Sequence, residues 1–280
     1  MTDYLQEANT TKNQEDFLNR IAKAANRPRH TLGEDPFVPV NDLPETTLAG
    51  KSQDELLELA RKNSEEVHVD FHVVKSADIG HTLNDFIQEK EIKSLMLPSF
   101  DEEKWQDYSL GKWQDNLRVD PIYYWEPEFG RQNIVNANNS DGAIGFAEFL
   151  LAESGTVTVA TYPQQGRMFH FLPTHYLAIV PKSKILPRSR QAMDYYQKAI
   201  QDGSLQTSNI NFITGPSNSG DIEMVLIVGV HGPLDMEYVV VEDMGYTLSG
   251  MDRDSMPDFF IQKRGHLLSP RYTINSPQKS

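Results

Sequence analysis

Apolar and polar residues alternate along residues 67–73, and this period of two predicts a strand with one wet face. The apolar positions are Val67, Val69, Phe71 and Val73, and the polar ones are His68, Asp70 and His72. Leu83, Phe86 and Ile87 then recur at helical spacing, and a short apolar run at 95–97 ends at Pro98. This strand–helix–strand order favours a parallel βαβ unit.

The second half of the chain continues this alternation of strands and helices. Residues 149–153 and 156–159 flank Ser154-Gly155, a pattern typical of a hairpin with a two-residue turn. Further predicted elements are strands at 176–180, 210–214 and 238–241 and a helix at 187–200. The apolar run 224–230 fits a strand or a buried helix, since periodicity does not separate the two. We therefore predict an α/β fold with a mainly parallel sheet and flanking helices.

The two ends of the chain have a different character. Residues 1–65 are polar and helical in pattern, with a Pro-rich arm at 26–44, and Ser52 with Glu55 matches a capping box at a helix start. We predict an N-terminal helical extension over 1–65, an α/β domain over 66–245 and an irregular tail over 246–280. The Trp-rich segment 100–132 fits a lid, an oligomer contact or a decorated surface loop.

Charge and composition narrow the classes of partner. The formal net charge is −14, and this sign disfavours nucleic acid and anionic membrane surfaces. The N-terminus carries early acidic residues and no apolar signal segment, and no apolar stretch approaches the roughly 20 residues of a membrane span. We predict a soluble, cytoplasmic protein without a membrane span.

The sequence contains no cysteine. Disulfides, thiolate nucleophiles, and Cys-ligated zinc or iron–sulfur clusters are therefore excluded on these 280 residues. Any electron transfer connected with this chain takes place on another protein or on a bound cofactor.

The segment 214–223 (TGPSNSGDIE) is the strongest local motif. Small and hydroxyl residues follow a predicted strand, where exposed backbone N–H groups can cradle an anion. The candidate ligand-binding residues are Gly215, Pro216, Ser217, Ser219, Asp221 and Glu223. The motif is not a P-loop because it lacks the terminal Gly-Lys-Ser/Thr. The alternative interpretation is a plain turn.

A second motif, 229–233 (GVHGP), places His231 and Gly232 at the end of an apolar run. A histidine there can act as a general acid or base or can donate to a ligand oxygen, although a hydrogen-bonded His in a tight turn fits equally. We expect Ser217, Asp221 and His231 to line one pocket, because loops at the ends of parallel strands converge. A separation of the two loops beyond about 15 Å would refute this expectation.

Glu153, Gly155 and Thr156 form a third candidate site, with the Glu153 carboxylate as nucleophile or base. The alternative is a solvated turn residue. No metal site is predicted: His68 and His72 would lie about 13 Å apart on a strand. His170 and His175 lack a nearby third ligand.

These motifs together resemble the lactate utilization protein C family, which carries the LUD domain. The segments 214–223 and 229–233 are similar to its paired signature, and 152–157 (AESGTV) is similar to the Ala-Glu-Thr-Gly-Thr-Ile/Val segment of that family. The resemblance is clear over about 141–242 and looser back to about 65. Asn218, Ser219 and Gly220 depart from the family pattern of a basic residue, Thr and Ala. The cationic side chain that would strengthen phosphate binding is therefore missing at this motif.

The resemblance implies a NagB/RpiA/CoA-transferase-like fold. It also implies a non-redox subunit that supports oxidation of L-lactate to pyruvate together with iron–sulfur partner subunits. The clusters would then lie on the partners, and we expect no cofactor bound by this chain, although a small anionic metabolite and a homo-oligomer remain open.

Two other functions fit the residues. One is a stand-alone enzyme of the CoA-transferase-like fold that uses Glu153 or His231 on an acyl-CoA or a phosphorylated small molecule. The other is a scaffold without a ligand. Whether the isolated chain is an enzyme therefore stays open at this point.

Overall fold

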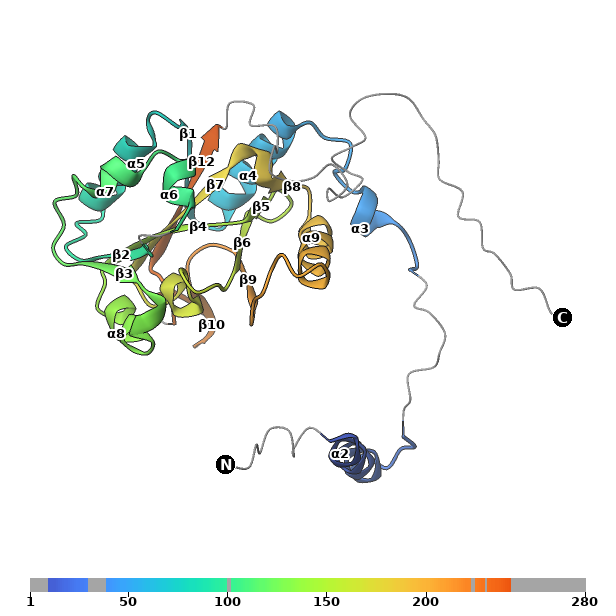
Figure 1. The fold of residues 1–280 in the computed structure, drawn as a ribbon. Coiled ribbons are helices and arrows are strands. Elements are labelled where there is room, and N and C mark those ends of the chain that lie inside the picture. Colours follow the sequence, from blue (N-terminus) through green and yellow to red (C-terminus); the bar gives the residue numbers. More distant parts are fainter. Residues whose placement is uncertain (1–9, 30–38, 100–101, 223–224, 230, 243–280) are drawn as a thin grey trace. The chain divides into compact units, whose positions relative to one another are not determined.

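The computed structural model describes residues 10–29, 39–99, 102–222, 225–229 and 231–242 (Figure 1). Contacts divide the chain into two units, residues 1–42 and 43–280. The first unit contains helix α2 (Thr11–Ala24), which begins where the Thr10 side chain accepts a hydrogen bond from the Asn13 N–H at 3.3 Å. Arg29 pairs with Glu15 at 3.0 Å within the same unit.

The second unit is built on a six-stranded sheet in which every neighbouring pair runs parallel. In spatial order its strands are β1 (Val69–Lys75), β12 (Asp235–Glu242), β7 (His175–Pro181), β4 (Gly142–Phe146), β2 (Leu95–Pro98) and β3 (Ile122–Trp125). The predicted α/β fold with a mainly parallel sheet is confirmed. β1 and β2 belong to this sheet, as expected, but three strands separate them.

Helices cover both faces of this sheet, so its strands are buried on both sides. The helices of this unit are α3 (Leu43–Thr46), α4 (Gln53–Glu66), α5 (Ile79–Glu89), α6 (Lys104–Asp107), α7 (Gly111–Gln114), α8 (Gln132–Asn138) and α9 (Ser189–Gln201), with short 3-10 turns at Pro127–Phe129, Arg167–His170 and Lys182–Lys184. Of these, α9 packs on the four-stranded sheet described below, and α3 contacts α9. Leu56 and Ala60 of α4 pack in one core cluster with Tyr176, whereas Leu83 and Phe86 of α5 pack in the other (Figure 1).

A second sheet of four strands adjoins the first. Its order is β8 (Ile185–Leu186), β5 (Phe149–Leu151), β6 (Thr156–Ala160) and β9 (Ile210–Ile213). β5 and β6 form the predicted antiparallel hairpin, but Leu151 pairs with Thr156, so the connection has four residues instead of two. The Ser52–Glu55 capping box at the start of α4 is confirmed, with the Ser52 N–H donating to Glu55 at 2.8 Å.

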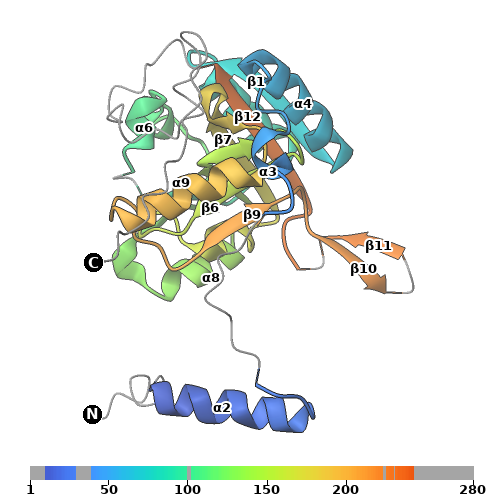
Figure 2. The same cartoon turned by 90° about the vertical axis from the view of Figure 1, so that its right-hand side faces the viewer.

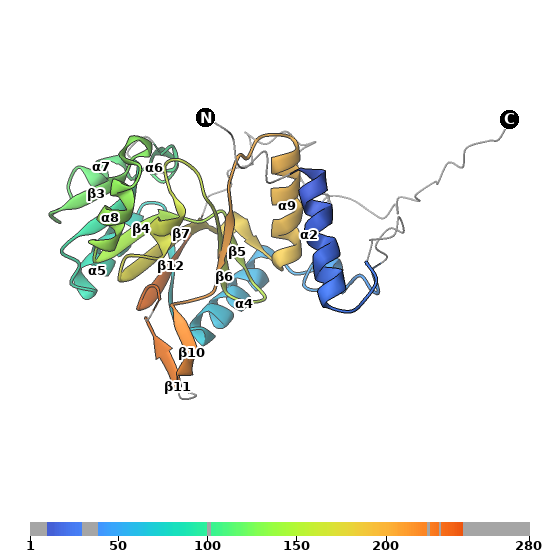
Figure 3. The ribbon, with the colours of Figure 1, turned by 90° about the horizontal axis from the view of Figure 1, so that it is seen from below.

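The chain also forms a separate hairpin of β10 (Asn218–Ile222) and β11 (Val225–Val228), which projects from the body of the unit (Figures 2 and 3). The segment 224–230 is therefore a strand over its residues 225–228. The predicted loop 215–221 is a loop only as far as Ser217, because Asn218 and Ser219 already pair with Val228 and Ile227.

The three tryptophans of the segment 100–132 pack in or against the core, whereas most of its other described residues are exposed or half-buried. Trp105 is buried and its indole N–H donates to the Ser99 carbonyl at 3.0 Å. Trp113 stacks on Trp105, and Trp125 meets Phe169 edge to face. The predicted tail at 246–280 lies outside the described residues. Within the described ranges, no helix is both long enough and apolar enough to cross a membrane.

Candidate functional site

The two predicted motif loops lie in contact, within the separation expected from the sequence, and a pocket lined by Ser217, Asp221 and His231 stays a prediction. The Gly229 N–H donates to the Ser217 carbonyl at 2.8 Å, and the Ser217 N–H donates to the Pro233 carbonyl at 3.0 Å. The His231 N–H reaches the Ser217 hydroxyl at 3.4 Å, while the His231 side chain is exposed. Gly232 lies so close that a Cβ on it would stand 3.1 Å from the Ser217 Cβ.

Several backbone amides where the loops 215–217 and 229–233 meet donate to acceptors within the protein. Those of Ser217 and Gly229 donate to carbonyls within these loops, and that of Gly215 reaches the Tyr238 hydroxyl at 3.4 Å. Pro216 is buried, and its carbonyl accepts from the Asn218 side chain at 3.3 Å. Of the amides that the sequence suggested for an anion, those of Ser217 and Gly229 join the two loops and that of Gly215 faces Tyr238.

The remaining residues of the first motif lie on or beyond β10. Ser219 pairs with Ile227 on β11, and Asp221 is a strand residue of β10. Glu223 lies outside the described residues.

Gly155 and Gly215 both approach the end of α4 closely. Gly155 has φ +63°, and a Cβ there would stand 2.6 Å from the Ser64 amide nitrogen. Gly215 has φ +68°, and a Cβ there would stand 2.3 Å from the Val67 carbonyl oxygen. Both positions require glycine for conformation and for space. Thr156 is buried beside them.

Glu153 is engaged by a cation. Arg188 donates to both of its carboxylate oxygens, with Nη2 2.7 Å from Oε1 and Nε in contact with Oε2. The Glu153 N–H donates to the Pro187 carbonyl, so the residue fixes the hairpin turn beside the start of α9. This bidentate geometry is typical of a structural ion pair.

The four histidines singled out in the sequence have different partners, although His72 and His175 are linked through the ion pairs that Glu237 and Asp235 make with Lys90. His68 turns the chain at φ +64°, and His72 on β1 faces Glu237 on β12 at 3.3 Å. His175 contacts the Asp235 carboxylate at 2.9 Å, and His170 contacts the Tyr176 hydroxyl at 2.9 Å. Among the described residues, no three His, Asp or Glu side chains are placed to hold a metal ion.

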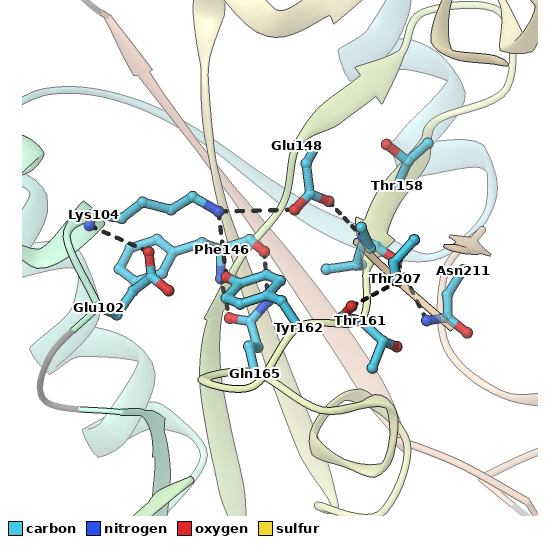
Figure 4. A network of polar contacts seen from close by, with 12 residues as sticks. Glu102, Lys104, Phe146, Glu148, Thr158, Thr161, Tyr162, Gln165, Thr207 and Asn211 are labelled. Carbon is cyan, nitrogen blue, oxygen red and sulfur yellow. Dashed lines mark hydrogen bonds and ion pairs between the residues drawn. The ribbon is translucent and has the colours of Figure 1, made fainter. Parts of the chain in front are cut away.

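A polar site that the sequence analysis missed lies where β4 passes into β5 (Figure 4). Glu148 connects these strands, and its Oε2 accepts the Ala160 N–H at 2.8 Å and the Tyr196 hydroxyl at 3.4 Å. Its Oε1 faces the Lys104 ammonium at 3.8 Å. Lys104 in turn donates to the Tyr162 hydroxyl at 3.3 Å.

The surrounding residues fix this site in place. Gln165 bonds both the N–H and the carbonyl of Phe146, at 2.9 and 2.8 Å, and so holds the end of β4 (Figure 4). Lys104 lies over the rings of Phe146 and Tyr162, at 5.7 and 5.1 Å from their centroids. These cation–π contacts position the ammonium at the edge of the core.

Burial shifts the pKa values of Glu148 and His170 in this region. Burial raises the pKa of Glu148 above its ordinary value, although Lys104 and the Ala160 N–H oppose that shift. Burial, with a further contribution from the charge of Lys104, lowers the pKa of His170 to about 3. His170 is thus neutral at pH 7, and its buried Nε2 has no hydrogen-bond partner among the described residues. Perturbed groups of this kind cluster at functional sites.

The sequence did contain a signal for Glu148. Residues 142–152 (GAIGFAEFLLA) are otherwise apolar, and a single carboxylate within such a run must find partners when the run is buried. A groove of about 440 Å³ lies next to this site and is lined by Trp125, Asn133, Thr161 and Tyr162, among others. Tyr162 therefore borders both the groove and Lys104.

Comparisons with known proteins agree with the motif resemblance. The LUD domain family matches residues 57–241. Lactate utilization protein C of Geobacillus thermodenitrificans is 39% identical over 246 residues, which cover 84% of this chain and 98% of that protein. Lactate utilization protein C of Bacillus subtilis is 37% identical over 240 residues, with coverages of 84% and 98%.

A crystal structure of a DUF162 family protein from Deinococcus radiodurans is similar at 15% identity and a TM-score of 0.47, covering 69% of this chain and 99% of that one. From the match over 57–241 and the near full-length relatives, the chain belongs to the LUD domain family.

Proposed function

We propose that this chain is a non-redox subunit of a lactate-utilization system, which supports oxidation of L-lactate to pyruvate together with iron–sulfur partner subunits. The observation that carries the proposal is the extent of the similarity. Relatives named Lactate utilization protein C match along 97–98% of their own length at 37–39% identity. The correspondence therefore includes the whole of those proteins and not a shared module alone.

The composition of the chain supports the assignment of the clusters to partner subunits. The 280 residues contain no cysteine, and thiolates are the usual ligands of iron–sulfur clusters. Electron carriers are accordingly assigned to partner proteins, and the chain contributes binding surfaces and the polar site at Glu148. We place the assembly in the cytoplasm.

Gene deletion tests the proposal directly. A strain that lacks this gene should grow normally on glucose and fail to grow on L-lactate as sole carbon source, and the full-length chain should restore growth. A tagged full-length chain should co-purify with Cys-rich proteins that carry the absorbance of iron–sulfur clusters. Undiminished growth of the deletion strain on L-lactate contradicts the proposal.

The alternative, a CoA-transferase-like enzyme with Glu153 as nucleophile, has less support. Both oxygens of Glu153 face Arg188, which makes the carboxylate a poor nucleophile as it stands. Incubation with acyl-CoA should leave Glu153 unmodified by mass spectrometry. A covalent adduct that Glu153→Gln abolishes would favour the enzyme instead.

A further inference from the structure

The Lys104 ammonium has hydrogen-bonding capacity that the protein does not fill. An ammonium has three N–H donors, and within the described residues one of them goes to the Tyr162 hydroxyl at 3.3 Å. Glu148 Oε1 is 3.8 Å away, which is beyond hydrogen-bonding distance. The Lys104 side chain retains 29% of its exposure, so solvent or a ligand can reach it.

Glu148 is similarly half engaged. Its Oε2 is occupied by Ala160 and Tyr196, whereas its Oε1 has the distant Lys104 as its partner among the described residues. A ligand oxygen placed off the line between Nζ and Oε1 could contact both groups at hydrogen-bonding distance. The gap therefore suits an oxygen-rich molecule that bridges the ion pair.

The place in the fold supports a ligand site. Glu148 follows the carboxyl end of β4 by two residues, and Lys104 follows the carboxyl end of the neighbouring strand β2 by six. In open parallel α/β sheets, ligands bind outside the carboxyl ends of the strands. Lys104 and Glu148 occupy that edge, whereas the predicted motif loops at Ser217 and Pro233 immediately precede strands β10 and β12.

The site fits a small monoanion. Among the labelled residues of Figure 4, Lys104 is the cation and Glu102 and Glu148 are the carboxylates, so the site accepts one anionic group when Glu148 carries a proton. Glu148 retains 18% of its side-chain exposure, so a ligand can reach only a small part of this side chain. Because burial raises the pKa of Glu148, a proton on this carboxyl costs less than on an exposed one, and a protonated carboxyl can donate to the ligand.

We infer that Lys104 and Glu148 bind a small 2-hydroxy or 2-oxo carboxylate, with Lys104 as the counter-ion of its carboxylate and Glu148 as the partner of its hydroxyl or carbonyl oxygen. The identity of the acid rests on the proposed function, because the relatives are named for lactate utilization. The position of the ligand rests on the geometry of Lys104 and Glu148, and its single charge rests on Lys104 together with a proton on Glu148.

Titration calorimetry on the full-length protein tests this inference, with L-lactate, pyruvate and propionate as probes. L-lactate and pyruvate should bind, and Lys104→Met should weaken both about tenfold or more, as expected for loss of a charge-assisted hydrogen bond. Glu148→Gln should weaken L-lactate more than propionate, which lacks the hydroxyl. Lys112→Met removes an exposed lysine on the neighbouring helix α7 and should leave the affinities unchanged.

Two results would overturn the inference. The first is that neither L-lactate nor pyruvate binds to the wild-type protein, even at millimolar concentrations of the acid. The other is wild-type affinity in Lys104→Met and Glu148→Gln variants whose circular dichroism and thermal unfolding match the wild type. If Lys104→Met loses its fold, Lys104→Arg takes its place; it keeps the charge and changes the donor geometry, so it should bind L-lactate and pyruvate more weakly than the wild type, and wild-type affinity in this variant would count against the inference.

Complementation separates this site from the proposed function. If deletion abolishes growth on L-lactate and Lys104→Met restores growth fully, the proposed function stands and the site is wrong. If the deletion strain grows normally on L-lactate, the proposed function is wrong, while the titrations still decide whether Lys104 and Glu148 bind the acid.

Discussion

Thr156 and Thr214 share a hydrogen bond of 2.7 Å between their hydroxyl oxygens. Thr156 begins β6 and Thr214 follows β9, so this bond joins two segments that stood out in the sequence as separate motifs. The Ser154 hydroxyl lies 2.7 Å from Thr156 and extends the chain of hydroxyls. Because Gly155 and Gly215 have no side chain, the ends of β6 and β9 in the four-stranded sheet can approach the end of α4 closely.

Substitution of Gly215 tests this close approach. Gly215→Ala adds a Cβ 2.3 Å from the Val67 carbonyl oxygen in a left-handed conformation, and should destabilise the protein by roughly 3 kcal/mol or more. Gly203→Ala is the control, because Gly203 has φ +80° and open space, so only about 1 kcal/mol is expected. Urea unfolding measures both, and equal losses would contradict the steric explanation.

Tyr238, on strand β12 of the six-stranded sheet, contacts the backbone on both sides of Thr214. Its buried hydroxyl donates to the Ile213 carbonyl at 3.2 Å and accepts the Gly215 N–H at 3.4 Å. Tyr238→Phe should lower the free energy of unfolding by about 1–3 kcal/mol, because a buried carbonyl and a buried N–H lose their partner. Tyr123→Phe serves as control, since its hydroxyl has no hydrogen bond to the described part of the chain. Similar losses in both variants would show that the hydroxyl of Tyr238 matters little.

His170 should make the protein less stable as pH falls. Its pKa in the folded state is about 3, while an unfolded histidine titrates near 6.5. Between these values the unfolded chain binds a proton that the folded chain does not, so stability is lost on acidification. From pH 7 to pH 5 this loss is about 2 kcal/mol. In His170→Gln the pH dependence over this range should be shallower by that amount, and an unchanged slope would refute the assignment.

His72 should act in the opposite direction. The hydrogen bond to Glu237 raises the pKa of His72 above its ordinary value, although partial burial opposes the shift. The stabilisation is thus fully present below the unfolded pKa of about 6.5 and is lost as pH rises through the higher folded pKa. His72→Gln should remove this loss above pH 6.5. Since the imidazole is 42% exposed, the effect should be smaller than that of His170 and should shrink with added salt. A steeper loss in the variant than in the wild type would contradict it.

Local pattern was sufficient for single elements and for the class of the fold. The alternation predicted at 67–73 corresponds to β1, which begins two residues later, at Val69, because His68 turns the chain, and which extends to Lys75. The capping box at Ser52 started α4, and the apolar run at 176–180 lies within β7. These features follow from residues within one or two turns of each other, and their physics is local.

The sequence by itself therefore determined a cysteine-free, acidic α/β chain of this family, with most of its strands in the right places. Only the tertiary structure decided that β12 lies between β1 and β7, since strand pairing joins residues more than 160 positions apart. The tertiary structure also showed that Gly155 and Gly215 pack closely against the end of α4, and that Lys104 and Glu148 lie side by side. A side chain's partners and its solvation depend on neighbours brought together by folding, which local periodicity does not encode.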